Sequence, residues 1–133
     1  MTDWTELKAP SLDDFAELAR QALAGLPPPF RALAADVVMR VADFPDEALL
    51  EEMGVEDPFD LTGVYAGTDL RRRSVLDTAV MPAEVLLFRR PILDEWAEHG
   101  AITLGELVAH VLVHELGHHF GLSDADIHAA EER

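Results

Sequence analysis

The N-terminal quarter of the chain has the spacing of apolar residues that is typical of an amphipathic helix. Apolar residues recur at three- and four-residue spacing over residues 11–26. Ser11 followed by Asp14 is a helix-start pattern, and Gly25 with the prolines at 27–29 marks the end. We therefore predict a first helix that buries one face and exposes the other.

The same spacing returns near the C-terminus. Thr103 and Glu106 form a capping-box pattern, which predicts the start of a long final helix. The buried side of this helix is predicted to consist of Leu104, Leu107, Val108, Val111 and Leu112. Two shorter helices are predicted over residues 46–53, before Gly54, and over residues 92–99.

Three segments have the β-branched and apolar content of strands. Residues 84–89 are the strongest candidate, with Pro91 closing the strand, and residues 63–67 form a short candidate bracketed by glycines. Residues 36–44 also resemble a strand, although the alanines at 34–35 could instead extend a helix.

Composition limits the classes of protein that this chain can belong to. Its 133 residues suit a single domain over residues 1–133, and the absence of cysteine excludes disulfides. No apolar run approaches the roughly 18 residues that cross a bilayer, and residues 1–6 lack the pattern of a secretion signal, so we expect a cytoplasmic protein. The net charge of −16 argues against nucleic acid and anionic membranes as partners. The arginines at 71–73, within the polar stretch 68–79, are interpreted as part of a solvated loop.

The end of the final helix carries the residues with the clearest chemistry. His114, Glu115 and His118 form the pattern H-E-x-x-H, followed by Gly121 and Asp124. Two histidines four residues apart lie one helical turn apart, so both imidazoles can reach one zinc ion. Gly121 can adopt the left-handed conformation that ends a helix, which would let the chain turn back and bring Asp124 to the same metal.

This ligand set predicts hydrolytic chemistry. A bound zinc lowers the pKa of a water molecule from about 15.7 to roughly 7, and Glu115 could accept the proton while an amide carbonyl is attacked. Asp126 is the competing candidate for the third ligand, and H-E-x-x-H also occurs by chance on helices. His110 is predicted to be a surface residue or to support a ligand, and His119 to face away from the metal because it is rotated about 100° from its neighbour. Tyr65 is interpreted as a core or rim aromatic.

Several spaced segments together resemble a known family. Residues 43–45, 57–67, 87–92 and 113–121 resemble the small bacterial zincin-like metallopeptidases, also called minimal zincins. The resemblance implies an α+β fold in which a small mixed β-sheet packs on the active-site helix. It also implies zinc bound by His114, His118 and Asp124, with Glu115 as general base. By analogy, residues 85–88 either pair with an extended peptide or protein substrate or form an ordinary interior strand.

One departure from related peptidases affects the expected function. Metzincin peptidases place a methionine turn beneath the metal after the motif, whereas the last methionine here is Met81. The only candidate after the motif for stabilising an oxyanion is His128. The sequence therefore predicts a zinc-dependent metallopeptidase. The alternative is a zinc-binding peptide-recognition or structural module with little or no turnover.

Overall fold

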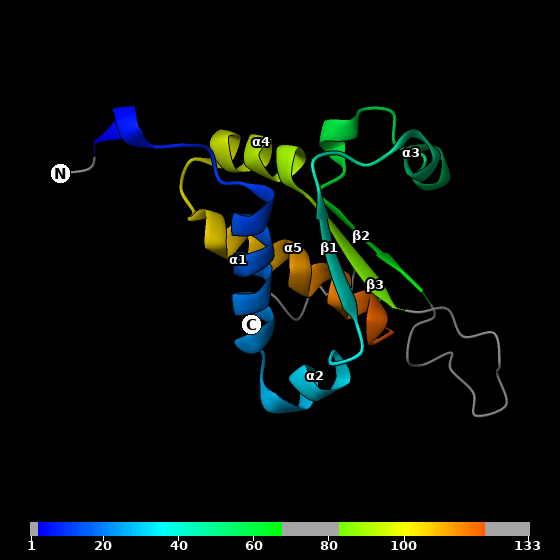
Figure 1. Ribbon diagram of the computed structural model, residues 1–133. Helices are drawn as coiled ribbons and strands as arrows, with labels where there is room; N and C mark the ends of the chain where they lie inside the picture. Colours follow the sequence, from blue (N-terminus) through cyan, green and yellow to red (C-terminus); the bar gives the residue numbers. More distant parts are fainter. Residues whose placement is uncertain (1–2, 68–82, 122–133) are drawn as a thin grey trace, which may run out of the picture.

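The protein consists of a small sheet surrounded by helices (Figure 1). The computed structural model describes residues 3–67 and 83–121. The elements in chain order are η1 (Trp4–Glu6), α1 (Leu12–Ala24), α2 (Pro28–Leu33), β1 (Val38–Ala42), α3 (Glu47–Met53), η2 (Pro58–Asp60), β2 (Gly63–Ala66), β3 (Glu84–Phe88), α4 (Arg89–His99) and α5 (Leu104–His119). The predicted irregular stretch 68–79, with the arginines at 71–73, lies outside the described residues.

The sheet is mixed, with strand order β1-β3-β2. β3 runs parallel to β1, where Val38 lies opposite Glu84, and antiparallel to β2, where Gly63 lies opposite Leu87. Because β3 is hydrogen-bonded on both sides, it has no free edge for another strand. The prediction that residues 85–88 pair with a substrate is therefore wrong, and the alternative of an interior strand is confirmed.

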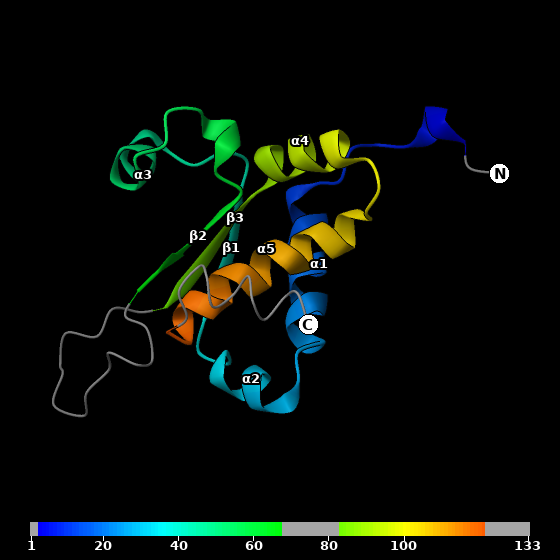
Figure 2. The ribbon, with the colours of Figure 1, turned by 180° about the vertical axis from the view of Figure 1, so that it is seen from behind.

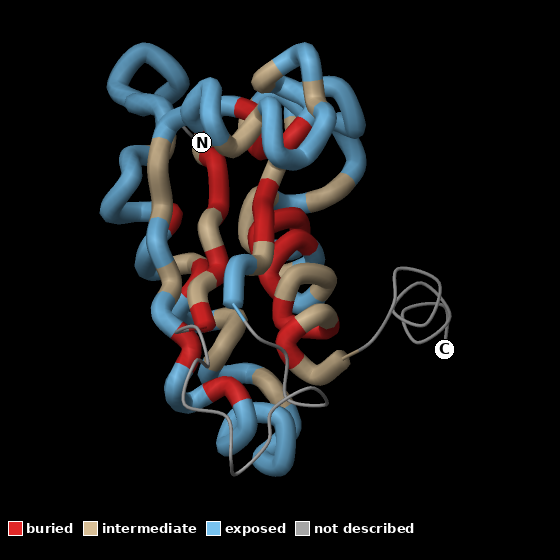
Figure 3. Tube along the Cα trace, turned by 90° about the vertical axis from the view of Figure 1, so that its right-hand side faces the viewer, coloured by how far each residue is buried: buried red, intermediate tan, exposed pale blue. Residues whose placement is uncertain are grey.

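Helix α5 packs against one face of this sheet and forms the main core with it. Seen from behind, α5 crosses the strands diagonally (Figure 2). Side chains alternate across a strand, so Val85 and Leu87 of β3 both face α5, and both are fully buried. The core also contains residues from α1, α4 and α5, namely Phe15, Ala19, Ile92, Leu107, Val108, Val111, Leu112 and Leu116. Buried positions gather in the interior and exposed ones on the outer turns (Figure 3).

A second, smaller core lies on the opposite face of the sheet. Val64 and Phe88 are buried there together with Leu61. Leu50 of α3 and Val55 pack against this cluster, which fixes α3 to the sheet. The observed α+β architecture, with a small mixed sheet on the motif-bearing helix, confirms the predicted fold class.

The predicted helix ends are confirmed where a specific cap was recognised. Ser11 and Asp14 form the reciprocal capping box of α1, as predicted. The helix predicted over residues 46–53 is α3, whose N-cap is Asp46. Thr103 accepts a hydrogen bond from the N–H of Glu106, which is one half of the capping box expected for α5.

Two helices begin at or near prolines that were predicted to end a helix or a strand. α4 begins at Arg89, three residues before the predicted start at Ile92, so Pro91 sits in its first turn. α2 follows directly after Pro27 and was not predicted. In both cases the missing proline N–H would have had no helical partner, so proline is compatible with the first turn of a helix.

Candidate metal centre

The last two turns of α5 bring together three residues that can hold a metal ion. One ligand atom from each of His114, Glu115 and His118 lies within 4.8 Å of the other two. The two imidazole rings are 5.4 Å apart between centroids and nearly perpendicular, and all three residues are half-buried. All three come from α5, where His118 lies four residues after His114 and three after Glu115 and so shares a helix face with each of them.

These residues fit a small divalent cation. Two nitrogens that share a zinc ion, each at about 2.1 Å, lie about 3.4 Å apart in tetrahedral geometry. Small side-chain rotations bring atoms within 4.8 Å of one another to that spacing. The donor set of two imidazoles and a carboxylate is also one that zinc prefers.

The turn after α5 has the conformation that the sequence predicted. Phe120 closes the helix, and Gly121 follows with φ of 84°, in the left-handed region. The N–H of Gly121 donates to the carbonyl oxygen of His118 at 3.0 Å. The helix therefore ends directly after the motif. The predicted third ligand Asp124, its competitor Asp126 and the oxyanion candidate His128 lie outside the described residues.

Strand β2 lies close to α5 where Gly63 faces Val111 and Glu115. A Cβ atom on Gly63 would lie 2.9 Å from Cγ1 of Val111 and 3.4 Å from Cγ of Glu115. Contacts below 3.0 Å are too short for real carbon atoms, so only glycine permits this spacing between strand and helix. From the sequence, Gly63 is predictable only as a bracket of the strand, because its contacts with Val111 and Glu115 join segments far apart in the chain.

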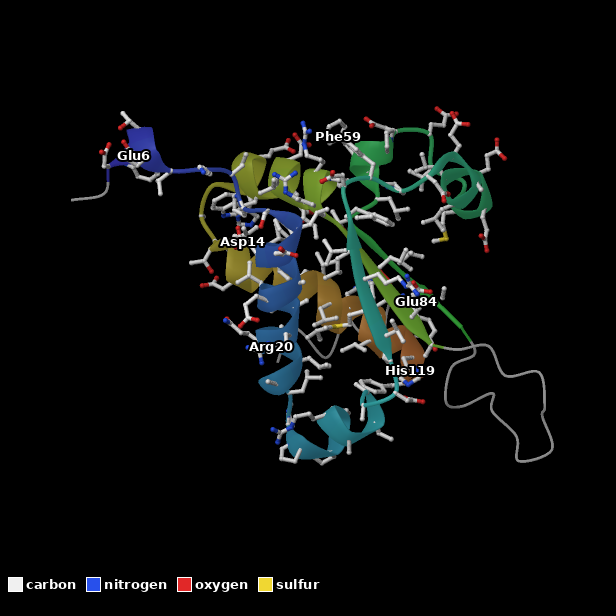
Figure 4. The ribbon with its side chains drawn as sticks, in the orientation of Figure 1. Glu6, Asp14, Arg20, Phe59, Glu84 and His119 are labelled. Carbon is white, nitrogen blue, oxygen red and sulfur yellow. The ribbon has the colours of Figure 1, made fainter. Side chains whose placement is uncertain are left out.

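A second contact between β2 and α5 involves His119, the residue that directly follows the motif. The Tyr65 hydroxyl and Nδ1 of His119 are joined by a 2.8 Å hydrogen bond, and His119 is completely buried. Nε2 of His119 lies 3.7 Å from a carboxylate oxygen of Asp36, just before β1. Figure 4 shows His119 at the end of α5, where the helix meets the sheet. His119 thus turns away from the cluster as predicted, and it links the last turn of α5 to segments at both edges of the sheet.

Aromatic rings continue this link across the end of the helix. The ring centroids of Tyr65 and His119 are 5.5 Å apart, those of His119 and Phe120 are 5.8 Å apart, and those of Phe120 and Phe30 of α2 are 5.5 Å apart. This row, which we call the aromatic row, supports the turn that carries His118. The hydrogen bond of Tyr65, predicted only to be a core or rim aromatic, has no local signal in the sequence because it joins residues 54 positions apart.

His110 does not join the metal-binding cluster. It is exposed, one turn before His114, which agrees with the prediction of a surface residue. Among residues 3–67 and 83–121, no helix is long and apolar enough to cross a membrane.

A helix bearing H-E-x-x-H, packed on a small mixed sheet, is typical of zincin metallopeptidases. The chain belongs to the zincin-like metallopeptidase family, whose sequence profile matches residues 34–133. A search of curated proteins found no match. The family match covers the sheet, α3, α4 and α5, and it leaves α1 and α2 outside.

Proposed function

We propose that the protein is a zinc-dependent peptidase in which His114, His118 and Asp124 bind the ion and Glu115 is the general base. The observation that carries the proposal is the convergence of His114, Glu115 and His118 on one side of α5. Membership of the zincin-like metallopeptidase family supports the same reaction class.

Each residue of the cluster has a distinct task in this proposal. When bound, zinc supplies a Lewis acid that polarises water and the substrate carbonyl. Glu115 accepts a proton from the attacking water at a carboxylate oxygen and later delivers it to the leaving amine. Its side chain lies against Gly63, so the edge strand limits where the carboxylate can move. The hydrogen bond between Tyr65 and His119 holds the helical turn that presents His118.

The substrate in this proposal is a peptide or protein segment in extended conformation that pairs with β2. In the described part of the sheet, β2 is an edge strand that pairs with β3, and Gly63 of β2 lies beside Glu115 of α5. A peptide added to its other side would gain main-chain hydrogen bonds and pass close to the general base. In this proposal β2, and not residues 85–88, is the strand that pairs with the extended substrate.

Replacing Glu115 with Gln tests the enzymatic role. Glu115→Gln keeps the size of the side chain but removes the base, so the variant is expected to retain one zinc per chain and to lose hydrolysis of a mixed peptide library by at least about a hundredfold. Glu106→Gln is the matched control, because it changes the same residue type in the first turn of the same helix, on an exposed position. The control is expected to keep both zinc and activity. Equal activity in Glu115→Gln and wild type would refute the role of Glu115.

The alternative is a zinc-binding module that recognises peptides or stabilises the fold without turnover. The observation that favours it is the missing methionine after Met81, which related peptidases place beneath the metal. The aromatic row occupies the end of α5 in this chain. Under the alternative, the wild-type protein loaded with zinc cleaves no member of the library, and its melting temperature falls when the zinc is removed.

A further inference from the structure

A groove separate from the metal centre lies between α3 and η2. Its volume is about 870 Å³, and its walls include Phe44, Phe59, Leu50 and Val55. The rings of Phe44 and Phe59 meet edge to face at 5.1 Å, and each side chain remains 37% exposed. Figure 4 shows Phe59 and His119 at opposite ends of the sheet. The groove therefore offers aromatic and aliphatic surface to a ligand without involving the zinc-binding residues.

The rim of the groove is acidic. Glu47, Glu51 and Glu56 line it, and residues 41–67 contain eight acidic residues and no lysine or arginine. No ion pair joins these three glutamates to a basic residue in the described part of the chain. An apolar floor with a negative rim is complementary to an apolar side chain flanked by lysine or arginine.

The protein itself shows the kind of contact that such a ligand would make. The guanidinium carbon of Arg90 lies 5.5 Å from the centre of the Phe44 ring, which is within range of a cation–π interaction. The wall of the groove thus already attracts one cation. A second copy of this chain is a poor occupant, because each copy carries a net charge of −16 and the two acidic rims would repel each other.

The position of the groove connects it to the proposed substrate path. Phe59 precedes Gly63 by four residues, and the chain from η2 leads through Leu61 directly into β2. An extended chain advances about 3.3 Å per residue, so the two positions are at most about 13 Å apart. A peptide paired with β2 beside Glu115 and continuing beyond Gly63 would reach the groove within about four to six residues.

We propose that the groove binds a basic, apolar segment of the same peptide substrate whose cleaved bond lies beside Glu115. The inference deepens the proposed function and rests on it for the identity of the occupant. It assigns to the protein a preference for substrates with an apolar residue between lysines or arginines, about four to six residues from the scissile bond.

Peptide binding tests the groove independently of hydrolysis. The probe is a fluorescently labelled synthetic peptide with a central Leu-Phe pair and two lysines on each side, and the protein is the zinc-loaded Glu115→Gln chain, which cannot cleave it. In low salt, fluorescence anisotropy is expected to show binding that weakens about tenfold when Glu47, Glu51 and Glu56 are all changed to Gln, because three exposed ion pairs are lost.

The control variant changes Glu6, Glu95 and Glu98 to Gln. These residues are exposed and lie outside the groove, and their replacement removes the same charge. Its affinity for the peptide is expected to fall less than twofold. Phe59→Ala, which leaves the charge unchanged, is expected to weaken binding about tenfold by removing one wall. Circular dichroism confirms that each variant is folded.

Three results would overturn the proposal. They are equal weakening by both triple variants, no binding of the peptide to the wild-type groove, and a wild-type dimer that dissociates when the three groove glutamates are neutralised. If the wild-type enzyme cleaves peptides but any of these results is found, the proposed peptidase stands and the groove assignment fails. If the peptide binds selectively and no cleavage occurs, the groove assignment stands as a binding site and the peptidase proposal fails.

Where cleavage does occur, kinetics give a second test. Substrates that carry the basic, apolar segment are expected to show a KM about tenfold higher with the groove triple variant, and unchanged kcat. Short substrates that end before the groove are expected to show no change in either quantity. An equal effect on long and short substrates would contradict a role for the groove.

Discussion

Substituting Gly63 by alanine perturbs the contact between the sheet and the motif-bearing helix with a single methyl group. The new Cβ would lie 2.9 Å from Cγ1 of Val111 and 3.1 Å from the carbonyl oxygen of Leu86. Ordinary contacts of this kind begin near 3.4 Å, so both neighbours would have to move by a few tenths of an ångström or more.

Neither neighbour moves easily. Val111 is branched at Cβ, stands in the middle of α5 and is buried, so its side chain has few alternative rotamers. The oxygen of Leu86 belongs to the backbone of the central strand β3, which is held by β1 and β2 on its two sides. The strain therefore falls on the spacing between β2 and α5, beside Glu115.

The expected cost follows from overpacking of a well-packed core, which typically destabilises by about 1–3 kcal/mol. Unfolding entropy is about 2.1 cal/mol/K per residue near the melting temperature, so a chain of 133 residues has about 0.28 kcal/mol/K. Gly63→Ala is therefore expected to lower the melting temperature by about 4–11 °C.

Calorimetry or thermal circular dichroism measures this change, and Gly105→Ala is the matched control. A Cβ on Gly105 would meet only Cδ2 of Leu18, at 3.8 Å, which is an ordinary contact. Because alanine favours the helix, this control is expected to leave stability unchanged or to raise it by up to about 1 kcal/mol. If Gly63→Ala melts at the wild-type temperature, the close approach of β2 to α5 is not as the structure has it.

Three further substitutions probe the turn after the motif and a surface ion pair. Tyr65→Phe removes the hydrogen bond to His119, so unfolding should become easier by about 1–2 kcal/mol and zinc affinity, measured by titration against a chelator, should fall; unchanged stability and affinity would show that the bond does not anchor the helix. Gly121→Ala forces a side chain into a conformation with φ of 84° and is expected to cost about 1–2 kcal/mol in denaturant unfolding, whereas no cost would contradict a left-handed residue there. Hydrogen bonds from Arg20 hold the pKa of Glu17 at about 2, so Arg20→Gln should return it towards 4.5 in an NMR titration. A carboxyl whose pKa is lower in the folded state stabilises the fold at a pH above its unfolded pKa, and this stabilisation is lost as the pH falls from 4.5 towards 2. Arg20→Gln should therefore lose less stability than wild type over that pH range. A Glu17 pKa still near 2 in the variant would exclude Arg20 as the cause.

Features with a local cause could be predicted from the sequence. The start of α1 follows from the pairing of Ser11 with Asp14, and the end of α3 follows from Gly54, whose φ is 69°. The left-handed turn at Gly121 was predicted for the same reason. Each of these features depends on residues within one or two helical turns, so spacing along the chain contains the information.

Features that depend on tertiary contacts could not be predicted in this way. Strand order is set by which faces can be buried together, and a single sequence does not show that β3 lies between β1 and β2. The bond from Tyr65 to His119 and the fit of Gly63 against Val111 likewise join distant segments. The candidate ligands on α5 were predictable because they share one helix.

The central claim is that His114 and His118 bind zinc together, and the position of the metal tests it most directly. Crystals of the zinc-loaded protein, measured at the zinc absorption edge, are expected to show one anomalous peak per chain at about 2.1 Å from a ring nitrogen of each histidine. A peak located elsewhere, or none beside these two nitrogens in protein that binds zinc in solution, would contradict the account.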